Sequence, residues 1–81
     1  MDPQTIISQF DQIYGPGKGM KMYLTVIPGI LADIQKMTTG AVPGQTVSEE
    51  YILEDGRAVL KMSALVKADG MLNLTAKVEK R

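Results

Sequence analysis

Two Asp-Gly pairs, Asp55-Gly56 and Asp69-Gly70, divide the C-terminal part of the chain into three runs rich in β-forming residues. Asp-Gly between such runs is a strong hairpin signal, because glycine readily adopts the positive φ angles of tight turns. We therefore expect an antiparallel meander of three strands. The predicted strands are residues 47–54, 57–67 and 71–79.

The register of the first hairpin follows from its side chains, since a slip of one residue exchanges the two faces of a strand. A two-residue loop at Asp55-Gly56 matches apolar residues with apolar ones and sets two acids opposite two bases. The predicted pairs are Leu53–Ala58, Tyr51–Leu60, Glu49–Met62, Ile52–Val59, Glu50–Lys61 and Glu54–Arg57.

The second turn is better explained by a three-residue loop, Ala68-Asp69-Gly70. A two-residue loop would place Leu60 opposite Glu79 and Met62 opposite Lys77. The three-residue loop instead matches apolar residues throughout one face. The predicted pairs are Val66–Leu72, Ala64–Leu74, Met62–Ala76 and Leu60–Val78.

Both turns agree on one buried face of the sheet. Its predicted members are Tyr51, Leu53, Leu60, Met62, Ala64, Val66, Leu72, Leu74, Ala76 and Val78. Glu49 is the exception on this face, and we place it at the rim of the sheet. The opposite face is mostly polar.

The N-terminal residues predict a helix over 3–14. Asp2 is a good N-cap, Pro3 suits the first helical position, and Gly15-Pro16 ends the helix. Its apolar residues recur at helical spacing: Ile6, Ile7, Phe10, Ile13 and Tyr14.

The segment 19–37 allows two interpretations. Pro28 inside a helix costs about 3 kcal/mol and Gly29 about 1 kcal/mol more, and proline pushes the residue before it towards extended geometry. We therefore predict a strand over 20–27 followed by a helix over 28–37. The alternative is one helix kinked at Pro28, which would keep a continuous apolar stripe.

These elements predict a single two-layer α+β domain over residues 1–81, with the helices on one face of the three-stranded meander. If residues 20–27 form a strand, it would be a fourth one that closes an edge of the sheet.

The composition excludes several kinds of chemistry. The chain has no Cys and no His, which removes disulfides and the nucleophile–base pairs that use these residues. The acids fall mostly at caps, turns and paired strand positions, so we expect no enzyme, no metal site and no cofactor. The longest uncharged run of the segment, between Lys21 and Asp33, has 11 residues, too few to span a bilayer. No signal peptide is visible, so a cytoplasmic protein, or a virion protein if the source is viral, is expected.

We expect a non-catalytic protein that acts through protein–protein contacts, as a self-assembling or structural subunit of a larger, virion-type assembly. The alternatives are a small regulatory or inhibitory binder of another protein, and a weak nucleic-acid binder that uses the lysines of the polar sheet face. Nucleic acid is not the favoured partner, because 9 bases balance 9 acids.

Two sets of residues on the polar face are candidate contacts. Apolar residues there suggest a protein interface: Ile52, Val59 and Leu65. Lysines there suggest contacts to an anionic partner: Lys61, Lys67 and Lys77. Lys61 and Lys77 lie opposite each other in the predicted register, and an acidic or phosphate partner would relieve their repulsion.

Overall fold

The computed structural model describes residues 2–53 and 55–81. Two helices precede a three-stranded antiparallel sheet in the strand order β1-β2-β3. The elements are α1 (Pro3–Tyr14), α2 (Gly19–Thr38), β1 (Thr46–Ile52), β2 (Ala58–Val66) and β3 (Leu72–Lys80).

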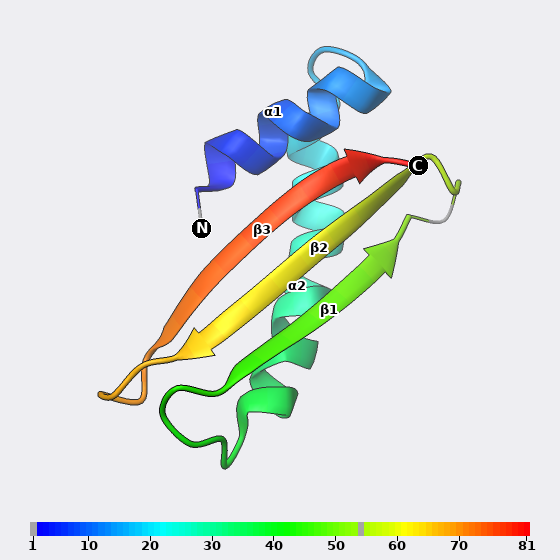
Figure 1. Ribbon diagram of the computed structural model, residues 1–81. Coiled ribbons are helices and arrows are strands. Elements are labelled where there is room, and N and C mark those ends of the chain that lie inside the picture. The colour runs from blue at the N-terminus through cyan, green and yellow to red at the C-terminus, as the bar shows by residue number, and fades with distance from the viewer. Residues whose placement is uncertain (1, 54) are drawn as a thin grey trace.

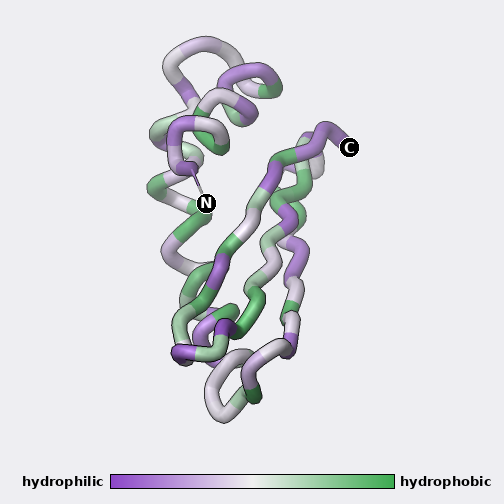
Figure 2. The backbone as a smooth tube through the Cα atoms, turned by 60° about the vertical axis from the view of Figure 1, so that its left-hand side comes forward, coloured by the Kyte–Doolittle hydropathy of each residue, from purple (hydrophilic) through white to green (hydrophobic). Residues whose placement is uncertain are grey.

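The helices and the sheet form two layers, as predicted. Both helices lie on the same side of the sheet, and the other side is uncovered (Figures 1 and 2). Helix α1 packs beside β3, whereas α2 runs beneath β1 and β2. The central strand β2 therefore has neighbours on both sides, and β1 and β3 form the two edges.

The predicted registers of both hairpins are confirmed. Tyr51 lies opposite Leu60, and Lys61 lies opposite both Glu50 and Lys77. The second loop has the three residues predicted, with Lys67 N donating to Met71 O at 2.8 Å and Gly70 at φ +83°. The predicted pair Glu54–Arg57 falls partly outside the described residues, because it includes Glu54.

The core lies between the sheet and the two helices. Buried strand residues contact buried residues of both helices, which excludes their apolar surface from water. The predicted sheet face is confirmed for nine of its ten members, which are buried or packed against the core. Tyr51 is the exception at 40% exposure, since it belongs to the edge strand, where the helix layer leaves it uncovered.

Helix α1 begins and ends where the sequence predicts. Gln4 N and Thr5 Oγ1 donate to the Asp2 carboxylate at 3.0 and 2.9 Å, so one acid satisfies donors of the first turn.

The predicted strand over 20–27 is wrong, and the alternative of one continuous helix is correct, because α2 is a single helix that contains Pro28. Ile27, Ile30 and Ile34 are buried along a single face of this helix, and that burial outweighs the local penalty of the proline. Pro28 itself is exposed, and so is Leu24 at 64%, whose carbonyl lacks its usual helical donor. Water can supply that donor at the surface.

The start of α2 is fixed by α1. Gly19 N donates to Asp11 Oδ1 at 2.6 Å, so Asp11 caps the N-terminus of the second helix from the first. Gly19 is buried, and a Cβ there would overlap the carbonyl oxygen of Ile7. Only glycine allows this close approach of the helices.

None of the helices in the described part of the chain is long and apolar enough to cross a membrane.

Candidate protein interface at the edge of strand β1

The outer edge of β1 is open. Gln45 O accepts from Val66 N, and Leu53 N donates to Ala58 O, so odd-numbered residues of this strand bond to β2. In an antiparallel ladder the alternate residues then point their amides and carbonyls away from the neighbour. Within the described residues these outward amides have no hydrogen-bond partner. They belong to Ser48, Glu50 and Ile52.

The outer edge of β3 is partly closed. The odd-numbered residues of β3 pair with β2: Lys67 N donates to Met71 O, and Arg81 N donates to Arg57 O. The even-numbered residues of β3 therefore face outward. One of these, Val78, donates its amide to Gln9 Oε1 of α1 at 2.6 Å. Helix α1 therefore protects this edge, and no element of the described chain does so for β1.

A cavity of about 320 Å³ lies between α2 and the C-terminal end of β1. Its apolar lining includes Met22 and Val26 of the helix together with Tyr51 and Leu53. The polar members of the lining include Asp55 of the first hairpin turn. The open edge of β1 thus adjoins a hollow large enough for side chains of a partner.

The first hairpin turn is held beside this cavity by α1. Tyr14 Oη donates to Asp55 Oδ1 at 2.9 Å, and the Arg57 guanidinium lies 4.6 Å from the centre of the Tyr14 ring. Burial, followed by the hydrogen bond to Asp55, raises the pKa of Tyr14 to about 12. The Tyr14 phenol is protonated at neutral pH and donates this bond, which keeps the turn anchored.

Two carboxyl groups face each other further along the gap between α2 and β1. Glu49 points inward from β1, and its Oε2 atom is buried without a hydrogen-bond partner. Burial, then the charge of the neighbouring Asp33 carboxylate of α2 and a hydrogen bond with it, raise the pKa of Glu49. Within residues 2–53 and 55–81, neither acid forms an ion pair with a lysine or arginine. The pair therefore has no cationic partner within these residues.

The predicted apolar contacts do not form one patch. Ile52 and Val59 lie directly opposite each other on the uncovered face. Leu65 is six residues further along β2 and pairs with Thr46, about 20 Å away at about 3.3 Å per residue. Ile52 and Val59 stand next to the open edge, so they can extend an interface that begins there.

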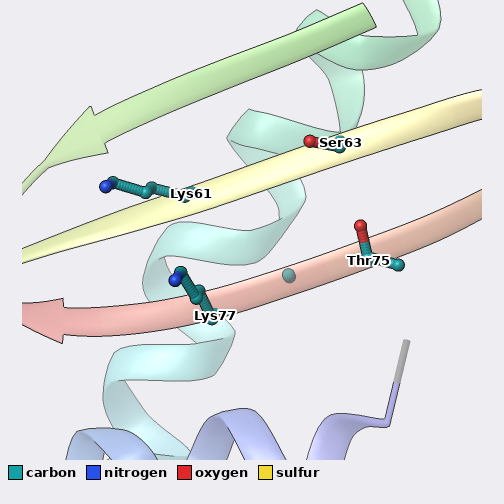
Figure 3. Close-up of a pocket in the computed structure, with 5 residues that line it drawn as sticks. Lys61, Ser63, Thr75 and Lys77 are labelled. Carbon is teal, nitrogen blue, oxygen red and sulfur yellow. The ribbon is translucent and has the colours of Figure 1, made fainter. Parts of the chain in front are cut away.

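The predicted lysine contacts also separate into two places. Lys61 and Lys77 line a hollow of about 270 Å³ on the uncovered face, together with Ser63 and Thr75 (Figure 3). Lys67 lies in the second hairpin, at the other end of the sheet.

The repulsion between Lys61 and Lys77 is relieved inside the chain. Glu79 lies 2.9 Å from Lys61 Nζ and 2.6 Å from Lys77 Nζ. Hydrogen bonds from Lys77 and Lys61 lower the pKa of Glu79 to about 2. An anionic partner at this hollow would compete with Glu79 for Lys61 and Lys77. The predicted lysine site therefore remains a prediction that these ion pairs do not support.

The described residues contain no group of three or more acidic side chains that could hold a metal ion.

The sequence predicts open sheet edges if residues 20–27 are helical, but it does not reveal the cavity or which edge is protected. Both depend on how the helices pack against the sheet. The sequence does single out Glu49 as an acid on an apolar face, and that was the available signal for the site.

Comparisons with protein-family models, with curated proteins and with solved structures found no match to this chain.

Proposed function

We propose that this protein is non-catalytic and acts through protein–protein contacts, by accepting an extended segment of a partner as a fourth strand beside β1. The observation that supports the proposal is the row of unpaired outward amides at Ser48, Glu50 and Ile52. An unprotected edge strand is a template for pairing. In strand addition, main-chain hydrogen bonds supply affinity, and pockets for alternate side chains supply specificity. The cavity beside Tyr51 is such a pocket.

The experiment selects random heptapeptides, displayed on phage, on the wild-type protein and on variants of Ser48. The S48P variant loses the outward amide but keeps the bonds of Val47 and Glu49 to β2, a position at which edge strands tolerate proline. The matched control is S48A, because both variants lose the hydroxyl that contacts Ser63 Oγ at 3.0 Å and only S48A keeps the amide.

Peptides should be enriched on the wild type and on S48A and lost on S48P. Circular dichroism confirms that each variant is folded, and Glu50→Pro replaces S48P if that variant is not. The absence of enrichment on the wild type, or equal enrichment on the proline variant, would contradict strand addition.

If the protein self-assembles as a subunit of a larger particle, the added strand would be β1 of a second copy. An antiparallel β1–β1 pair centred on Glu49 or Glu50 sets identical acids opposite each other, which is unfavourable. Centring on Ser48 sets Glu49 opposite Val47 and Glu50 opposite Thr46. Self-assembly through this edge therefore requires a register that keeps the two acids apart.

The molar mass in solution distinguishes this form from a regulatory binder of another protein. Light scattering after size-exclusion chromatography, from micromolar to millimolar concentration, should show a dimer or larger species that S48P abolishes if the protein self-assembles. A monomer over the whole concentration range would overturn self-assembly, and another protein would then remain as the partner.

A further inference from the structure

The gap between α2 and β1 offers two different environments to an added strand. Near Tyr51 the gap widens into the mostly apolar cavity, and at Glu49 it contains a half-buried carboxyl group, one oxygen of which is buried, with Asp33 beside it. Tyr51 and Glu49 are two residues apart in β1, and both point to the side of the helices. Successive inward side chains of an added strand would therefore meet first one environment and then the other.

We propose that the partner of this edge is a segment of another protein that carries an apolar residue and, two positions later, a lysine or arginine, added antiparallel to β1. The proposal rests on strand addition as the function and specifies the chemistry of the strand. Antiparallel pairing is the more stable arrangement per residue. In this direction the residue opposite Tyr51 precedes the residue opposite Glu49.

Charge complementarity identifies the second of these residues. Directly opposed side chains in an antiparallel pair have Cβ atoms about 4.5–5.5 Å apart, so a basic side chain opposite Glu49 can reach both carboxylates. No cation of the described chain forms an ion pair with either of them. A partner base would supply the hydrogen-bond donor that Glu49 Oε2 lacks, and a charge-assisted bond of this kind is stronger than a neutral one.

Charge also argues against a second copy as the preferred occupant. Strand β1 carries Glu49 and Glu50 and no basic residue, so a copy of β1 brings further acidic side chains to Glu49 and Asp33. A foreign strand with a base at the matching position removes this conflict.

The apolar residue is identified by the cavity. Met22 and Val26 of α2 with Tyr51 and Leu53 provide its apolar lining. A leucine, methionine or phenylalanine side chain opposite Tyr51 would bury its surface there, which is the favourable contribution to binding that does not depend on charge.

The test is the sequence pattern of heptapeptides selected on the wild-type protein. The proposal expects enrichment of an apolar residue followed, two positions later, by Lys or Arg. The charge-reversing variant Glu49→Lys should change the second position to Asp or Glu. Enriched peptides without this spacing, with the reverse order, or with the same basic preference on the E49K variant would overturn it.

A failure of this kind is distinct from a failure of strand addition, because the loss of binding in S48P does not depend on the peptide's side chains. If peptides are lost on S48P but show no basic residue at the expected place, only the partner chemistry is wrong.

A milder pair of variants covers the case in which E49K does not fold. The affinity of one selected peptide, with threonine opposite Glu50, is measured by isothermal titration on E49Q and on E50Q. E49Q should weaken binding at least about tenfold, the size expected for loss of a charge-assisted contact, and E50Q, on the other face of the same strand, less than about threefold. Equal effects of the two variants would contradict a specific contact at Glu49.

Discussion

The two edge strands of the sheet, β1 and β3, differ in how much of their outer edge the rest of the described chain covers. At β3, helix α1 lies alongside and Gln9 accepts the outward amide of Val78. At β1, the outward amides of Ser48, Glu50 and Ile52 have no hydrogen-bond partner in the described chain. Edge strands are an aggregation hazard that proteins usually protect. An edge that stays open beside a cavity, when α1 closes part of the other edge, is better suited to binding.

The charges of the two edge strands differ in the same way. Glu79 of β3 contacts two lysines of its own sheet, and this lowers its pKa. Glu49 of β1 has another carboxylate as its neighbour, and its pKa is raised. Glu79 is satisfied by two lysines, and Glu49 has no ion-pair partner among the described residues. The following predictions test this contrast, beginning with the largest expected effect.

Gly19→Ala should remove the difference between the two edges by displacing α1 from β3. The new Cβ would overlap Ile7 O, so the helices must separate, and we expect a loss of about 3 kcal/mol or more in the free energy of unfolding. Urea denaturation followed by circular dichroism measures it. The matched control is Gly29→Ala in the same helix, where a Cβ meets no atom within 4 Å and a gain of up to about 1 kcal/mol is expected. Equal effects of the two substitutions would contradict the close helix crossing.

Gln9→Leu should open the protected edge without moving the helix. The Val78 amide loses its acceptor in a partly buried place, at a cost of about 1–3 kcal/mol. Gln12→Leu on the same helix, at an exposed position, should change the free energy of unfolding by less than about 0.5 kcal/mol. Thermal denaturation of the two variants compares them, and an unaffected Q9L variant would show that Gln9 does not close this edge.

Glu49→Gln should stabilise the unbound protein at neutral pH. A carboxyl group whose pKa is higher in the folded state is penalised when ionised, so its contribution to stability falls as pH rises from its ordinary value through the raised one. The variant lacks this penalty, and its advantage over the wild type should shrink as the pH is lowered to 4. Urea midpoints at several pH values measure this. A variant that is less stable than the wild type at pH 7 would show that Glu49 has a stabilising partner.

Glu79→Gln should have the smallest effect, since its ion pairs are solvent-exposed. A carboxyl group whose pKa is lowered in the folded state contributes stability above its ordinary pKa of 4.5 and loses it as the pH falls towards 2. The wild type should therefore lose more stability than the variant between pH 5 and 2, as followed by thermal denaturation. Parallel pH profiles would mean that Glu79 does not hold the two lysines.

Much of the sheet could be predicted from the sequence, because the information is local. Asp-Gly turns and facing side chains determine the register between Tyr51 and Leu60 as well as between Leu60 and Val78. Helix α2 could not be predicted in the same way. The penalty of Pro28 is visible in the sequence, but the burial that offsets it comes from strands encoded later in the chain.

The candidate site was predictable only in part for the same reason. The sequence marks Glu49 as an acid on an apolar face, yet Asp33, the second carboxylate, is a solvent-exposed residue of a helix. Only the packing of α2 against β1 brings them together. The apolar residues Ile52 and Leu65, which the sequence groups on one face, lie at opposite ends of it.

Residue-resolved amide hydrogen exchange by NMR tests directly whether the outer edge of β1 is open and the outer edge of β3 is closed at Val78. Ser48, Glu50 and Ile52 should exchange much faster than Glu49 and Tyr51, whose amides bond to β2. The Val78 amide should be protected although it also points outward, and this protection should be lost in Q9L. Protection of the outward amides of β1 equal to that of Glu49 and Tyr51 would contradict the account.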